Sequence, residues 1–264
     1  MRPLRSVWPL LTLLLIVVLW LTLTAADSST ARVIPTPGDV WAAFVRNRQT
    51  LLTLHIPTTL LETLIGLLLA LLLGVGLALL LDWSPLARQM LFPLLVVSQT
   101  IPTIALAPVL ILIFGFGIEP KVTVVVLFCV FPIMVNTLEG LTATSPDAVL
   151  LLRSLGADRW QTWRKARWPS ALPGLFSGLR IAATYSVAGA IVGEYVSSNA
   201  GIGQYMRLAY ASAHLDQVFV AIVITALLSL ALVALVTAVE RLIIPWHYAH
   251  LQTGQWNPSA TGLD

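Results

Sequence analysis

The chain is short of charge and of cysteine. Only 10% of its 264 residues are charged, which is far below the share that a soluble domain carries. The one cysteine, Cys129, falls inside an apolar run. A single cysteine excludes an intrachain disulfide and a cysteine-based metal site, and we interpret it as a packed small hydrophobic residue.

Sequence signatures of catalysis are missing too. The chain has no phosphate-binding loop of the Gly, four residues, Gly-Lys-Ser/Thr type, no His-Glu pair with a second His and no paired-Asp cluster. Its four histidines are scattered over loops and the C-terminus, which is typical of solvated residues rather than ligands. We therefore predict no catalytic residue, no cofactor and no metal site.

Apolar residues make up 58% of the chain, and runs of membrane-spanning length recur throughout it. Five qualify readily as spans: 7–23, 60–81, 91–113, 122–138 and 218–239. A sixth, 179–196, is diluted by the small residues that a helix buried among helices uses. The sequence thus predicts an all-α, multi-pass bundle of about six helices in a bacterial cytoplasmic (inner) membrane, with both chain ends on one side.

The distribution of Lys and Arg gives the orientation, because cytoplasmic loops retain basic residues. Arg2, Arg5, Arg88, Arg241 and the basic segment 145–179 all fall on the side that we assign to the cytoplasm. The net charge of +3 reflects this bias, so membrane lipid is an expected partner and nucleic acid is not.

The first apolar run allows a second interpretation. A basic start and an apolar core precede Ala25 and Ala26, which is also the pattern of a cleaved signal peptide. Cleavage would leave five spans and an external N-terminus.

The segment 145–179 has internal structure. Ser145 is a good N-cap, Pro146 suits the first helical position, and Gly156 is the residue favoured just past a helix end. We expect a short helix there, then a second one from Asp158 that Pro169 and Pro173 stop before the next span.

This segment resembles the cytoplasmic signature of the permease subunits of binding-protein-dependent ABC importers. Gly156 takes the Gly position, Ala166 the Ile position and Trp168-Pro169 the Leu-Pro position, at the same spacing. The signature opens with Glu-Ala-Ala, where this chain has Leu150, Leu151 and Leu152, so a salt bridge made by that Glu is not expected here.

The resemblance extends over about residues 35–240. It includes Pro35-Thr36-Pro37, Gln99-Thr100-Ile101-Pro102, and Gly193-Glu194 followed by Gly201-Ile202-Gly203. Within the family, Gly178-Leu179-Arg180 and the run from Leu151 to Ala157 look most like the nitrate, sulfonate, taurine and thiamine-precursor group, in its branch that imports the thiamine pyrimidine precursor or riboflavin.

The resemblance implies an ABC type I importer permease fold, in one transmembrane domain over 1–264 with a core at 60–245. It implies three partners: a cytoplasmic ATP-binding subunit, an extracytoplasmic substrate-binding protein and a second permease copy in a homodimer. It also implies that the loop helix docks into the ATPase, through Ala148, Val149, Leu150, Leu151, Leu152, Arg153, Ser154, Leu155 and Gly156. A loop that merely anchors to anionic lipid is the alternative.

A translocation path needs polar residues inside spans, where they are costly and mark function. The candidates are Gln99, Thr100, Thr103, Asn136, Tyr185, Ser186, Gly189 and Glu194. Glu194 either faces an aqueous vestibule or extends to the interface, and Glu62 is expected at the interface. Ser186, Gly189 and Gly193 share one helical face, which we interpret as lining the conduit or contacting a neighbouring helix.

Two function classes remain open from the residues. One is a transport subunit energised by a separate ATPase, with a heterocyclic vitamin or precursor as substrate and sulfonate, taurine or nitrate as alternatives. The other is a membrane enzyme or an autonomous secondary transporter, which would need convergent reactive groups or internal repeats. The sequence displays neither convergent reactive groups nor internal repeats.

Overall fold

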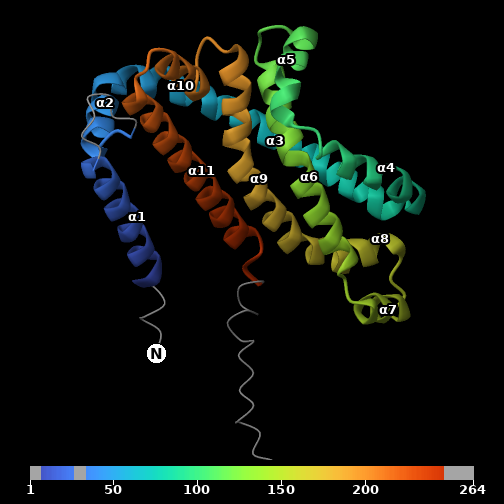
Figure 1. Cartoon of the computed structure of the whole chain (residues 1–264). Coiled ribbons are helices and arrows are strands. Elements are labelled where there is room, and N and C mark those ends of the chain that lie inside the picture. The colour runs from blue at the N-terminus through green and yellow to red at the C-terminus, as the bar shows by residue number, and fades with distance from the viewer. Residues whose placement is uncertain (1–6, 27–33, 247–264) are drawn as a thin grey trace, which may run out of the picture.

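The computed structural model describes residues 7–26 and 34–246, and all regular structure in these ranges is helical (Figure 1). The helices are α1 (Val7–Ala26), α2 (Pro37–Thr50), α3 (Ile56–Trp83), α4 (Pro85–Ser98), α5 (Thr103–Phe114), α6 (Glu119–Thr142), α7 (Pro146–Ser154), α8 (Arg159–Thr162), α9 (Trp168–Ser197), α10 (Ile202–Ala211) and α11 (Leu215–Ile243). Two π-helical turns, η2 (Leu51–His55) and η3 (Trp163–Arg167), join α2 to α3 and α8 to α9.

Four helical runs in the described ranges are long and apolar enough to cross a membrane, and a bent pair would make a fifth. The four contain α3, α6, α9 and α11, which confirms the spans expected at 60–81, 122–138, 179–196 and 218–239. The run expected at 7–23 forms the 20-residue helix α1. Figure 1 places the start of α1 and the end of α11 at the same end of the bundle as α7.

The expected span 91–113 is wrong as one continuous helix. Its residues form α4 and α5, whose axes differ by 99° across the break at Gln99 to Pro102. Pro102 takes an extended conformation and has no N–H to continue a helix. A hydropathy average over the run does not detect such a bend, because the segments on both sides of the break are apolar.

The two π-helical turns carry the chain through prolines without ending a helix. Each lies directly before an X-Pro step, and its closing amide bonds the carbonyl five residues back: Ile56 to Leu51, and Trp168 to Trp163. The wider turn relieves the clash between the proline ring and the preceding turn. The expected helix stop at Pro169 and Pro173 is therefore wrong, and a single helical run covers Arg159–Val196.

The core of the bundle is a backbone-to-backbone contact between α6 and α9. A Cβ added to Gly178 would lie 2.5 Å from the Pro132 carbonyl oxygen, and one added to Gly140 would lie 2.9 Å from the Ala171 Cα. At Gly193 it would lie 2.9 Å from the Lys121 Cα. Small residues along both helices thus let them touch over most of their length.

The small-residue stripe of α3 serves the same purpose. Gly66 faces Val125 of α6, and Gly74 faces Ile133 of the same helix. These small-residue stripes of α3 and α9 are therefore contacts within one chain.

We predict that Gly178→Val lowers the thermal unfolding midpoint of the purified protein strongly, because the added atoms overpack a closed backbone contact and cost about 3 kcal/mol. Gly76→Ala is the matched control, since a Cβ at Gly76 meets nothing within 4 Å. It should be neutral or slightly stabilising in a helix interior. Similar midpoints for the two variants would contradict the α6–α9 contact.

Candidate coupling and translocation sites

The expected loop helix is present as α7. Pro146 lies in its first turn and Asp147 faces the positive end of its dipole. Ser145 is the N-cap residue, as predicted, but its side chain makes no capping hydrogen bond. The helix ends in the left-handed turn that Gly156 provides at φ +82°. There the Gly156 amide bonds the Arg153 carbonyl and the Ala157 amide bonds the Leu152 carbonyl. Since a Cβ at Gly156 would meet no atom within 4 Å, backbone conformation alone requires glycine.

Three leucines of α7 and the turn that ends it are exposed, beside the exposed polar residues Asp147, Arg153 and Ser154. Leu150, Leu151 and Leu155 are 69%, 60% and 75% exposed, although they lie in a loop outside the spans. No described residue covers them. An apolar patch of this kind on a short helix needs a partner surface.

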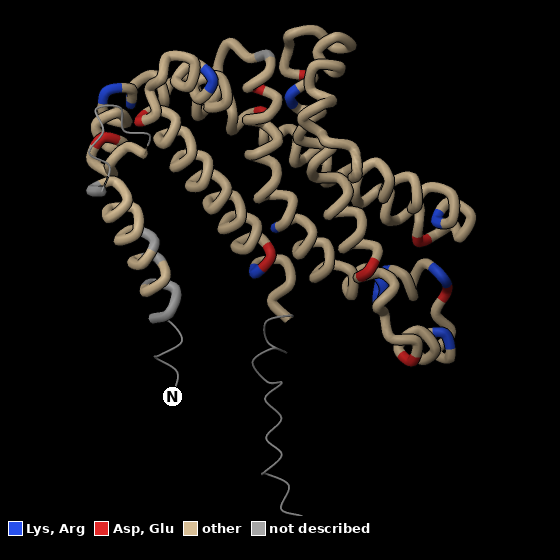
Figure 2. The backbone as a smooth tube through the Cα atoms, viewed as in Figure 1, with Lys and Arg blue, Asp and Glu red and all other residues tan. Residues whose placement is uncertain are grey.

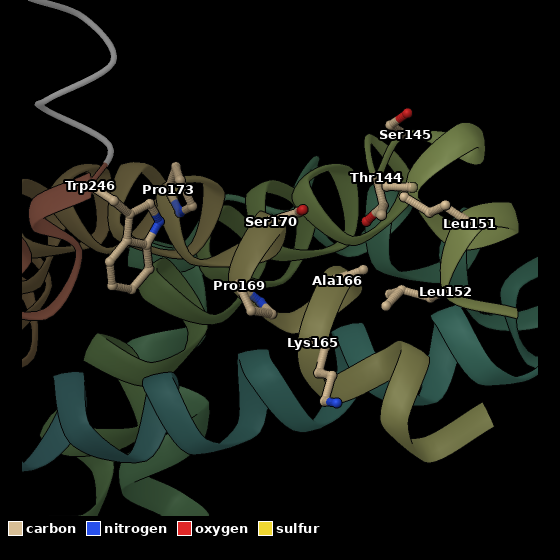
Figure 3. A pocket seen from close by; sticks show the side chains of 11 residues that line it. Thr144, Ser145, Leu151, Leu152, Lys165, Ala166, Pro169, Ser170, Pro173 and Trp246 are labelled. Carbon is tan, nitrogen blue, oxygen red and sulfur yellow. The ribbon is translucent and has the colours of Figure 1, made fainter. Parts of the chain in front are cut away.

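A cavity of about 450 Å³ opens between the inward face of α7 and the base of α9 (Figure 3). Leu152 of α7 and Ala166 of η3 line it together, with Pro169 and Trp246 farther along its wall. This cavity separates part of α7 from the base of the bundle. The capping box of Asp158, which bonds the Gln161 amide at 2.7 Å, fixes the start of the next helix as expected.

The candidate path residues fall into two groups. Gln99 and Thr100 are exposed in the turn between α4 and α5, and Tyr185 is exposed on α9. Thr103 and Asn136 are half-buried, and the Asn136 amide donates to the Pro132 carbonyl at 2.8 Å.

The second group is buried. The Ser186 hydroxyl bonds the Ala183 carbonyl at 2.9 Å, and Gly189 packs on Val125 and Phe128 of α6. Of the two interpretations of that face, contact with a neighbouring helix is the one that the geometry favours. Glu194 neither reaches a vestibule nor extends to the interface, since it is fully buried.

Glu194 anchors α10 to the spans. Its carboxylate accepts bonds from the Thr59 hydroxyl and the Gly203 amide, both at 2.6 Å. Thr59 in turn accepts from the Ile202 amide at 2.9 Å, so α3 and α9 together satisfy the first amides of α10. The His55 ring bonds the Gly201 carbonyl at 2.9 Å just before that helix begins.

A buried ion pair lies beside this anchor. Lys121 of α6 donates to Glu62 of α3 at 2.9 Å and to the Ser198 hydroxyl at 2.8 Å. The expectation of an interfacial Glu62 is therefore wrong. The sequence does not predict this pair, because Lys121 lies 59 positions from Glu62, although His55, Thr59 and Glu62 share one helical face and indicate a polar contact there.

The exposed faces of the spans differ in kind. Those of α3 and α11 are dominated by leucine, as expected against lipid. On α9, Ile181, Thr184, Tyr185 and Ala188 form an exposed stripe that carries two hydroxyl groups. Polar groups facing hydrocarbon are costly, so this stripe should meet water or protein. Within the described ranges, no group of three or more His, Cys, Asp or Glu could hold a metal ion.

Comparison with known proteins agrees with this geometry. Residues 66–245 match the family model described as "Binding-protein-dependent transport system inner membrane component". The chain is 36% identical to a formylaminopyrimidine transport permease of Halalkalibacterium halodurans, over 93% of this chain and 98% of that one. It is 37% identical to a riboflavin transport system permease of Chloroflexus aurantiacus, over 60% and 59%. A crystal structure of an amino acid ABC transporter shares the fold, with a TM-score of 0.62 at 16% identity, over 76% of this chain and 98% of that one.

The buried pair yields a stability prediction. Lys121→Met leaves Glu62 buried without its cation, and the other oxygen of Glu62 has no described partner. The loss should be about 3–5 kcal/mol, measured as a lower unfolding midpoint. Arg46→Gln removes the outer pair with Asp216, whose arginine is 62% exposed, and should cost less than about 1 kcal/mol. Equal losses of unfolding stability in the Lys121→Met and Arg46→Gln variants would contradict the buried position of Lys121.

Proposed function

The chain belongs to the binding-protein-dependent transport system inner membrane components, and on that premise we propose that it forms the conduit for a small heterocyclic nutrient, either riboflavin or a thiamine pyrimidine precursor. As a family member it is a multi-pass inner-membrane permease subunit of an ABC importer, and ATP hydrolysis belongs to a separate subunit. The substrate proposal rests on one observation: the formylaminopyrimidine permease is 36% identical over nearly the full length of both chains.

In this proposal, α7 docks into the ATPase subunit and transmits its conformational change to the permease. The segment Ala148 to Gly156 projects from the bundle with exposed leucines, and a cleft on the ATPase would bury them. Fully burying a leucine side chain is worth about 1.5–3 kcal/mol, so a few of them suffice to hold a docking helix.

The path itself runs, in this proposal, along the exposed stripe of α9. Tyr185 is the one residue of the original path candidates on that stripe, and Thr184 joins it. Facing a second copy of the chain, two such stripes would enclose a polar conduit, so we propose a homodimer with one path between its halves. Gln99, Thr100, Thr103 and Asn136 remain proposed path residues on α4 to α6, and Ser186, Gly189 and Glu194 support the path from within the bundle.

Uptake in cells tests the substrate. Deleting this permease should abolish uptake of labelled formylaminopyrimidine or riboflavin, and the intact chain should restore it. Taurine, sulfonate and nitrate are the alternative substrates. If the heterocycle proposal is right, their uptake should stay unchanged. A loss of anion uptake with heterocycle uptake intact would overturn the assignment.

Co-purification tests the docking helix. Leu150→Asp with Leu151→Asp places two charges in the apolar patch, so the ATPase subunit should be lost from the purified complex while the permease is recovered in full. Leu208→Asp is the control, because Leu208 is also an exposed leucine but lies on α10 at the opposite end. Full retention of the ATPase by the double variant would rule out α7 as the docking helix.

A further inference from the structure

A ladder of three stacked tryptophans connects α8 to α9. The ring centroids of Trp160 and Trp163 are 5.1 Å apart at an interplanar angle of 13°, and those of Trp163 and Trp168 are 5.5 Å apart at 26°. On a regular α-helix, residues five apart point about 140° away from each other. The π-helical turn η3 brings Trp163 and Trp168 toward one side, which explains the second stack. The outermost ring, Trp160, is 61% exposed.

Cations flank this ladder. Arg159 and Arg164 are exposed, and neither forms an ion pair with any residue in the described ranges. Arg167, by contrast, bonds Asp82 at 2.7 Å. Asp158, next to Arg159, directs its carboxylate to the Gln161 amide instead. The segment therefore presents unbalanced positive charge beside an exposed indole.

The ladder lies where the apolar surface of the bundle begins. The Arg167–Asp82 pair ties η3 to the end of α3, directly before the exposed Trp83 and Leu86. Figure 2 shows charged residues gathered along the backbone at this end, with an almost uncharged stretch of α3 and α6 above them. Tryptophan rings and cations at this level are characteristic of a membrane–water interface.

We propose that Arg159, Trp160, Trp163 and Arg164 bind the headgroup of an anionic phospholipid in the cytoplasmic leaflet. The guanidinium groups would donate to the phosphate oxygens, and the indole rings would lie at headgroup depth. The acyl chains would follow the apolar surface at Trp83 and Leu86. An acidic face of a partner protein is the competing occupant, but it does not explain an exposed tryptophan at the edge of the lipid-facing surface.

Occupancy of this site has a consequence for transport, which rests on the proposed function. The ladder is the packed connection between the α7–α8 loop and the span α9. A lipid bound there stiffens the joint through which α7 would pass force, so coupled ATPase activity should require anionic lipid.

Direct lipid binding tests the site without reference to the substrate or the ATPase. The purified full-length permease is titrated with phosphatidylglycerol, and with phosphatidylcholine in parallel, and bound lipid is counted by native mass spectrometry. Arg159→Gln with Arg164→Gln should weaken phosphatidylglycerol binding about thirtyfold, because each cation near an anionic surface contributes about a factor of five. Trp160→Ala should weaken it as well, and Trp160→Phe should restore most of it.

The control is Arg48→Gln, an exposed arginine on α2 at the other end of the bundle, which should bind lipid as the native chain does. Equal binding of the two lipids by the native chain would overturn the proposal, as would equal losses in the control and the double variant. If the double variant instead binds lipid normally and loses the ATPase subunit, the surface belongs to a protein contact and the lipid site is wrong. Lipid binding is measured on the purified permease, so a negative result in the heterocycle uptake experiment would not change it.

Discussion

The close approach of α6 and α9 is the constraint on which the rest of the structure depends. The two helices flank the loop that carries α7 and α8, with α6 leading into α7 and α9 following η3. Their contact runs from Gly140 against Ala171 at the loop end to Gly193 against Lys121 at the outer end. Closely packed backbones transmit displacement with little compliance. α7 and the polar anchor around Glu194 thus lie at the two ends of one closely packed helix pair, so a displacement of α7 would be passed to the elements that hold α10.

Several features could be predicted from local sequence. Apolar runs located α3, α6, α9 and α11 because burial in lipid depends on length and composition alone. Gly156 located the end of α7 because only glycine takes a positive φ without strain. Other features depend on contacts that no local pattern encodes. The break between α4 and α5 changes direction and leaves hydropathy unchanged. Glu62 was expected at the membrane interface from its position near a span end, but its partner in the bundle is Lys121, 59 positions away.

The prolines show how one local rule is overruled. Pro169 should end a helix, and the chain instead widens one turn into η3 and continues. The same solution at Pro57 joins α2 to α3 in a 47-residue helical run. A π-helical turn has poorer hydrogen-bond geometry than an α-helical turn, and here it lies directly beside the loop that carries α7 and α8. It rotates the segment before α9 relative to the span, and this rotation stacks the tryptophans and places Arg167 on Asp82.

Among the described residues, three ion pairs join helices inside the bundle, whereas the buried Glu194 is held by hydrogen bonds alone. Lys121 meets Glu62, Arg167 meets Asp82, and Arg180 of α9 bonds Glu240 of α11. A buried ion pair gains little over apolar packing, but breaking one leaves an uncompensated charge in a medium of low dielectric constant. Such pairs therefore fix the register between helices. Because Arg180 is committed to Glu240, the stripe beside it offers hydroxyl groups and an aromatic ring in place of a net charge. In the proposed conduit, these hydroxyl groups and this aromatic ring would bind a neutral polar ring by hydrogen bonding and would not select strongly for charge.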